Sequence, residues 1–197
     1  MKDNYIRPKL LFSKYKKSLV SHLGLKQDEL VGIIKYEELY QKFEENLLSY
    51  LYMCSTEFDE VNELILELKN CSPYHNDVIE CSTIQIALNI AVVISYSRNF
   101  TNNYGFYNTK DINKFLIQSY TKAEVKLHKI VLEKRNKEFA HSDASANNIQ
   151  IFSEGDFLFG INRLRQPLEF NDLDLLHKMV FKLGKEVERQ IGNFSAK

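Results

Sequence analysis

Two residues of this chain, Arg135 and His141, have side chains that together could cleave a phosphodiester. Arginine stays charged at every physiological pH and binds phosphate oxygens with a planar fork of N–H donors. Histidine exchanges a proton near neutral pH, so it can act as a general base or a general acid. Within reach of one ribonucleotide phosphate, this pair would be enough to cleave RNA without a metal ion.

Asn136 and Asp143 flank the pair and are the candidate supporting residues. Asn136 directly follows the arginine, and its amide could hold a phosphate or the imidazole. Asp143 lies two residues after His141, close enough in sequence to orient the imidazole through a hydrogen bond. The hypothesis therefore has two catalytic residues, Arg135 and His141, and two that support them.

Three further cations, Arg98, Lys134 and Lys137, are candidates for RNA contact. Arg98 would supply a second phosphate contact from the end of an upstream helix. Lys134 and Lys137 belong to a basic block over residues 122–137, and we expect them to contribute electrostatic field rather than direct contacts.

A purely structural interpretation of the same residues stays open. Arg135 would then pair with Glu133 or Glu138, and His141 would cap the end of a helix, where the macrodipole favours a cation. The remaining histidines have no partner at metal-ligand spacing, and we expect structural or surface roles for them: His22, His75, His128 and His177.

Helical geometry restricts how Arg135 and His141 can meet. Six residues at 100° each leave their side chains about 120° apart in a continuous α-helix, and about 9 Å apart along its axis. The pair therefore needs a helix that ends at Phe139 or Ala140, or two copies of the chain that share one cleft across a two-fold axis.

The run RNKEFAHSD, from Arg135 to Asp143, resembles the Arg-x(4–6)-His motif of HEPN domains, with five residues between the arginine and the histidine. A Tyr-x-Arg-x-Phe step at residues 96–100 is similar to one found upstream in that group, so the resemblance covers roughly residues 78–192. HEPN domains are all-helical and include many metal-independent ribonucleases of defence and toxin–antitoxin systems.

The resemblance implies an all-α helical bundle, a homodimer with a composite site in its groove, and an RNA substrate. It also implies an endoribonuclease that needs no cofactor or metal, acting as a toxin or phage-defence effector, with an antitoxin as a possible protein partner. The alternative is a non-catalytic HEPN-like dimer that binds RNA, a nucleotide or a protein partner. A third hypothesis is a helical interaction protein with a purely structural role.

Composition supports a folded domain and argues against a protein that coats nucleic acid. The 197 residues carry 26 basic and 26 acidic side chains, so the net charge is zero. Non-specific nucleic-acid binders usually carry a large positive balance. Charge is segregated instead, with a basic N-terminus, an acidic stretch over residues 37–67 and the basic block before the motif.

Cysteine usage and hydropathy favour a cytoplasmic protein that does not enter a membrane. Cys54, Cys71 and Cys81 fit no metal-ligand spacing and are expected to be thiols in a reducing compartment. The longest apolar stretch, residues 84–94, is too short to span a bilayer, and no signal peptide is visible.

Hydrophobic periodicity predicts a basic arm or short helix over residues 1–35 and a helical domain over residues 36–197. Within the domain we expect a helix over 36–52, and a second one that starts at an N-cap on Thr56 and ends near Asn70.

The rest of the chain should contain three longer helices, a short helix and a hairpin. A helix over 78–97, capped by Asn76 or Asp77, is apolar on nearly all sides and should lie at the centre of a bundle. After a short helix near 111–119, the motif helix should span 122–139. A small β-hairpin around 154–156 should precede a last helix capped by Asn171 or Asp172.

Overall fold

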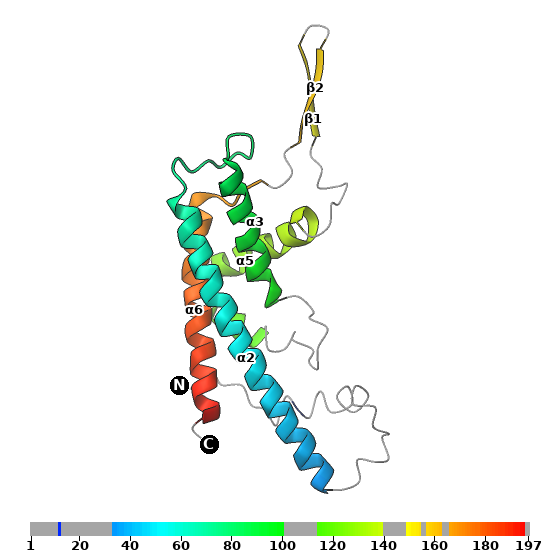
Figure 1. Ribbon diagram of the computed structural model, residues 1–197, viewed down its shortest axis with the longest axis vertical. Coiled ribbons are helices and arrows are strands. Elements are labelled where there is room, and N and C mark those ends of the chain that lie inside the picture. Colours follow the sequence, from blue (N-terminus) through cyan, green and yellow to red (C-terminus); the bar gives the residue numbers. More distant parts are fainter. Residues whose placement is uncertain are drawn as a thin grey trace. The chain divides into compact units, whose positions relative to one another are not determined.

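Helices form most of the structure, which is a computed structural model describing residues 12, 33–100, 114–139, 149–154, 157–162 and 166–195 (Figure 1). The predicted all-α fold is confirmed. The principal elements are α2 (Ile33–Asn70), α3 (Thr83–Arg98), the 3-10 turn Ile117–Ser119, α5 (Lys122–Lys134), a π-helical turn (Arg135–Phe139), β1 (Ile149–Glu154), β2 (Phe157–Asn162) and α6 (Phe170–Ser195).

Helix α2 is a single element of 38 residues, so the predicted break at Thr56 is wrong. The Thr56 hydroxyl donates to the Tyr52 carbonyl at 3.2 Å, a bond within the helix that replaces the expected cap. No glycine or proline lies between residues 33 and 70, and the apolar positions keep helical spacing across Thr56. Nothing in the sequence therefore stops the helix there.

The described residues divide into two compact units. The first comprises residues 12, 33–56, 100, 114–118 and 183–195, and the second comprises 57–99, 119–139, 149–154, 157–162 and 166–182. In the first unit, the ring of Phe12 is fully buried and makes edge contacts with Tyr40 and Phe43, with centroids 5.4 Å apart in both pairs. Burial of these rings supplies part of the core of that unit.

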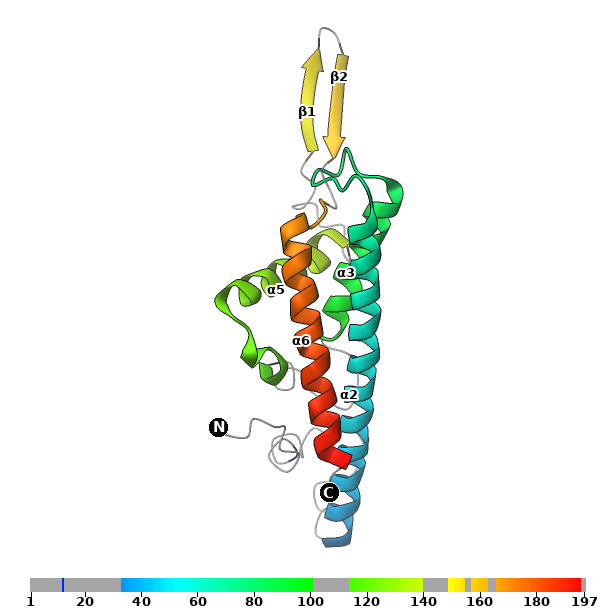
Figure 2. The same ribbon diagram turned by 90° about the vertical axis from the view of Figure 1, so that its left-hand side faces the viewer.

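The candidate site residues that the structure describes all lie in the second unit. Its apolar core comes from four helical segments: Phe58, Val61, Ile65 and Leu68 of α2; Val92, Val93 and Tyr96 of α3; Leu127 and Val131 of α5; and Leu173, Leu176, Met179 and Val180 of α6. Residues 57–70 of α2 and 170–182 of α6 lie side by side in both views (Figures 1 and 2). The Lys69 ammonium donates a hydrogen bond to the Asp174 carboxylate and links the two helices.

Helix α3 begins five residues later than predicted, at Thr83, because Ser82 caps it instead of Asn76 or Asp77. The Ser82 hydroxyl accepts the Gln85 amide proton at 3.1 Å. The buried residues of α3 include polar side chains, among them Gln85 and Asn89. Polar side chains therefore form part of the buried face of α3.

The segment before α6 is fastened to the unit by hydrogen bonds from several elements. The Leu168 amide donates to Oδ1 of Asn89 on α3 at 3.0 Å, and the Tyr74 hydroxyl donates to the Leu168 carbonyl at 2.5 Å. Helix α6 then starts at Phe170, one residue before the nearer of the two predicted caps. These bonds fix where the chain returns to the bundle after the hairpin.

Strands β1 and β2 pair antiparallel at the place where the sequence predicts a hairpin, with Ile149 opposite Asn162 and Glu154 opposite Phe157. Gly155 and Asp156 of the predicted turn lie outside the described residues, as do most of the predicted arm over 1–35 and the loop over 143–148.

Candidate active site

Helix α5 leads into the segment that carries Arg135, and hydrogen bonds fix its first turn. Thr121 and Glu124 form a capping box: the Thr121 hydroxyl accepts the Glu124 amide proton, and the Glu124 carboxylate accepts the Thr121 amide proton at 2.6 Å. Lys182 of α6 donates to the same carboxylate at 2.7 Å. Burial alone would raise the pKa of Glu124, but the bonds from Lys182 and Thr121 outweigh it and leave the pKa lowered.

The helix changes its winding at Arg135. From Arg135 to Phe139 the backbone forms a π-helical turn, which we call the π turn, and described helical structure reaches Phe139 as predicted. π turns are rare and often occur at functional sites. The change of winding falls between Arg135 and His141, so the 120° separation derived for a regular α-helix does not apply to this segment.

The Arg135 guanidinium is held by its neighbour. Its Nη1 donates to Oδ1 of Asn136 at 2.9 Å, and Arg135 is half-buried whereas Asn136 is exposed. This contact uses one of the five N–H donors of a guanidinium and limits its freedom. Helix α3 packs against both α5 and the π turn, so the arginine stands on a supported piece of backbone (Figure 1).

The two lysines beside Arg135 make contacts within the protein. Nζ of Lys134 donates to the Gln166 carbonyl at 2.8 Å, which ties the end of α5 to the segment before α6. Nζ of Lys137 pairs with Glu133 at 2.6 Å, one helical turn earlier, and both side chains are exposed. Of the two glutamates proposed as structural partners of Arg135, Glu133 therefore contacts Lys137.

Arg98, at the end of α3, lies beside Glu57 of α2. Burial raises the pKa of the Glu57 carboxyl, and the nearby Arg98 guanidinium partly opposes that rise. Tyr96 contacts α5, and a residue two positions further along a helix points about 200° away. Arg98 is therefore directed away from the side of α3 on which Tyr96 contacts α5.

His141 and Asp143 lie outside the described residues, so their place relative to Arg135 stays a prediction.

The sequence did not predict another group of polar side chains in this unit. The Tyr96 hydroxyl lies 2.8 Å from Nδ1 of His128 and 3.2 Å from the Tyr120 hydroxyl. Tyr96 and His128 are buried, and burial followed by the charge of Lys129 lowers the pKa of His128 to about 4.

A signal for His128 was present in the sequence: it stands between Leu127 and Val131 on the apolar face of the motif helix. A histidine at such a position is usually a core residue with a hydrogen-bond partner. The expectation of a structural role for it therefore agrees with its burial, but the sequence could not name Tyr96 and Tyr120 as its neighbours.

The segment between α2 and α3 lines a pocket of about 360 Å³ that includes Cys71, His75, Glu80 and Cys81. Within the described part of the chain, no three His, Cys, Asp or Glu side chains are arranged to hold a metal ion. Nor does any helix among the described residues have the length and apolar character needed to cross a membrane.

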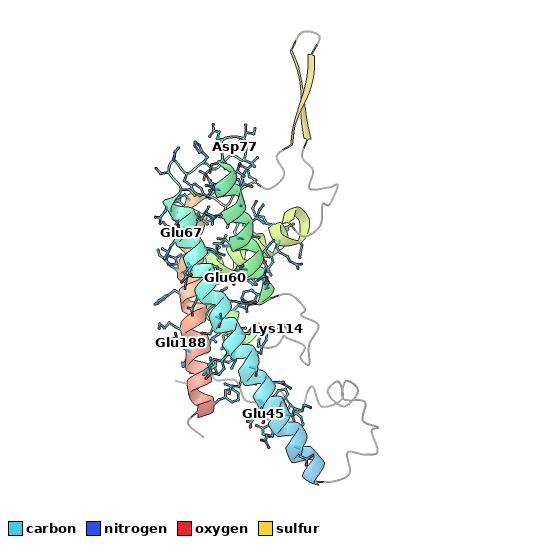
Figure 3. The ribbon with its side chains drawn as sticks, viewed as in Figure 1. Glu45, Glu60, Glu67, Asp77, Lys114 and Glu188 are labelled. Atoms are coloured by element: carbon cyan, nitrogen blue, oxygen red, sulfur yellow. The ribbon has the colours of Figure 1, made fainter. Side chains whose placement is uncertain are left out.

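Acidic side chains mark α2 and the segment that follows it, as Figure 3 shows for Glu60, Glu67 and Asp77. Glu60 accepts a hydrogen bond from Ser95 of α3 at 3.3 Å, so part of the acidic stretch serves the packing of α2 against α3.

Comparison with known proteins gives no match for this chain among family models, curated proteins or solved structures.

Proposed function

We propose that this chain is a homodimeric, metal-independent endoribonuclease in which Arg135 and His141 act on the phosphodiester of RNA. The observation that supports this proposal is the π turn: it starts at Arg135, rests on α3 and holds the guanidinium against Asn136. A half-buried arginine at a local change of helix winding is a suitable phosphate ligand. Resemblance to the Arg-x(4–6)-His motif supplies the histidine six residues later.

The chemistry requires only side chains. His141 takes the proton from a ribose 2′-OH, and the oxygen attacks the adjacent phosphorus. Arg135 stabilises the charge that develops on the phosphate oxygens. The 5′-oxygen leaves with a proton from His141 of the partner subunit, and the products carry a 2′,3′-cyclic phosphate and a 5′-OH. DNA lacks the 2′-OH and is not cut.

In this proposal Asn136 orients the arginine and Asp143 orients His141, while Lys134 and Lys137 add positive field. The dimer is part of it, because two motifs facing each other across a two-fold axis bring both histidines to one groove. A growth-inhibiting toxin or phage-defence effector, acting in the cytoplasm and held in check by a protein partner, is the setting that the resemblance implies.

Two observations favour a second candidate, a non-catalytic dimer that binds RNA, a nucleotide or a protein. Nζ of Lys134 and Nζ of Lys137 are both engaged within the protein, at Gln166 and Glu133, and the net charge is zero. A binding protein of this kind would hold its ligand through Arg135 without needing His141 as a base.

The deciding experiment is cleavage of a labelled RNA in EDTA by wild type, His141→Ala and Arg135→Ala, with His177→Ala as the matched control. We expect cleavage by wild type and the control, loss in both motif variants, and cyclic-phosphate ends on the products. Cleavage that survives His141→Ala, or that EDTA abolishes, would overturn the mechanism. RNA binding without cleavage by wild type would establish the second candidate.

A further inference from the structure

Tyr96, Tyr120 and His128 form a cluster that joins two segments far apart in sequence. Tyr96 and His128 are buried, and Tyr120 is half-buried. Tyr96 lies in the last turns of α3 and is fully buried, while His128 lies in the middle of α5 and is 7% exposed. Their polar atoms are 2.8 Å apart, and the Tyr120 hydroxyl lies 3.2 Å from that of Tyr96. The imidazole makes edge contacts with both rings, with centroids 5.8 Å and 6.0 Å away.

The position of this cluster on α5 relates it to the candidate site. His128 precedes Arg135 by seven residues, which is two α-helical turns, so the two residues lie on nearly the same side of the helix. Helix α3, which carries Tyr96, also packs against the π turn. The hydrogen bond therefore fixes α5 against the same helix on which the π turn rests.

A hydrogen bond between α3 and α5 can set the register of the two helices more sharply than apolar packing can. The hydrophobic effect has no preferred direction, whereas a buried hydrogen bond is favourable only within a narrow range of distances and angles. Its net contribution to stability is modest, because both groups lose water when they are buried. Such a contact is better suited to setting the register of two helices than to holding them together.

We infer that Tyr96 and His128, supported by Tyr120, are positioning residues that set the π turn, and with it Arg135, in the orientation needed for phosphate binding. The inference rests on the proposed function for its consequence in catalysis. Its structural part, the control of the π turn by the Tyr96–His128 contact, can be tested without any activity.

The test compares wild type with the double variant Tyr96→Phe/His128→Leu. Removing both polar partners of the Tyr96–His128 bond leaves neither of them unpaired, and the half-buried Tyr120 hydroxyl loses one contact, so thermal stability should fall only slightly. Hydrogen exchange of the amides of Arg135–Phe139 should nevertheless become about tenfold faster. RNA cleavage in EDTA should show kcat lowered by about tenfold with KM near the wild-type value.

Two further variants keep the test decisive. Ser95→Ala removes a hydrogen bond from the neighbouring residue of α3, to Glu60 of α2, and should leave the exchange of the π turn unchanged. Tyr96→Phe alone removes a single hydroxyl and perturbs the core less. It therefore takes the place of the double variant if the double variant does not fold. We expect it to speed exchange at Arg135–Phe139 as well.

The outcomes separate the inference from the proposed function. If wild type cleaves no RNA but the exchange of Arg135–Phe139 responds as expected, the proposed function fails and the positioning of the π turn stands. If the exchange of these amides stays at the wild-type rate in the Tyr96 and His128 variants, the positioning inference is overturned, whatever cleavage does.

Discussion

The guanidinium of Arg135 donates a hydrogen bond to the side-chain oxygen of the next residue, Asn136, at 2.9 Å, at the point where α5 becomes a π turn. Adjacent residues of a regular α-helix point about 100° apart and rarely hold each other in this way. The bond between these neighbours coincides with the change of winding, and it restricts the orientation of the Arg135 guanidinium.

Replacing this arginine by lysine tests whether the planar fork matters or only the charge. Arg135→Lys keeps a cation but loses the bidentate geometry and the contact with Asn136. We expect RNA cleavage to fall by about a hundredfold, with the free energy of unfolding changed by no more than about 0.5 kcal/mol. Asn136→Ala should lie between this variant and wild type. Equal cleavage by wild type and Arg135→Lys would show that charge alone suffices.

The sequence predicts those features of the structure that depend on residues close together along the chain. The span of the motif helix to Phe139 followed from its own periodicity, and the position of Arg135 late in that helix followed with it. The break assigned to Thr56 was wrong because threonine serves equally as a cap and as a helix residue bonded to the preceding turn. The cap of α3 was misplaced because Asn76, Asp77 and Ser82 are all good capping residues.

Contacts between distant segments lay beyond sequence reasoning. Nothing near Lys134 in the sequence indicates that its ammonium bonds the Gln166 carbonyl, 32 residues away. The partners of His128 are equally remote, because Tyr96 precedes it by 32 residues. Such contacts depend on how α3, α5 and the segment before α6 pack, and a single sequence with no packing information does not determine that.

The ion pair between Glu124 and Lys182 should stabilise the second unit more than a surface pair does. The Glu124 side chain is only 7% exposed, so removing its cation leaves a buried charge. We expect Lys182→Met to lower the free energy of unfolding by about 2 kcal/mol and Glu124→Gln by about 1 kcal/mol, measured by urea denaturation at pH 7.

The exposed pair Lys185 and Glu188 provides the control, and Lys185→Met should change stability by less than about 0.5 kcal/mol. Because the folded pKa of Glu124 is lowered, its contribution is present above pH 4.5 and is lost as the pH falls through the folded pKa. An effect of Lys182→Met no larger than that of the control would contradict this account.

The three cysteines should differ in their reaction with iodoacetamide. Cys54 is fully buried, whereas Cys71 and Cys81 are half-buried and line the same pocket. Burial, followed by the charges of Asp77 and Glu80, raises the pKa of Cys81, which keeps more of it in the unreactive thiol form. Mass spectrometry of native protein should find Cys54 unlabelled until denaturant is added, and alkylation of Cys81 should accelerate as the pH is raised.

The stability of the second unit should fall as the pH drops below neutrality, because His128 is buried in its neutral form. Its pKa lies at about 4 in the folded chain against an ordinary 6.5, so the unfolded state takes up the proton first. The contribution of His128 is therefore complete above pH 6.5 and is lost between pH 6.5 and 4, by up to about 3 kcal/mol. Urea denaturation across this range measures it. His128→Leu should remove this part of the pH dependence, whereas His177→Leu should keep it. A wild-type curve that parallels that of His128→Leu between pH 6.5 and 4 would show that the imidazole is not held neutral by its burial.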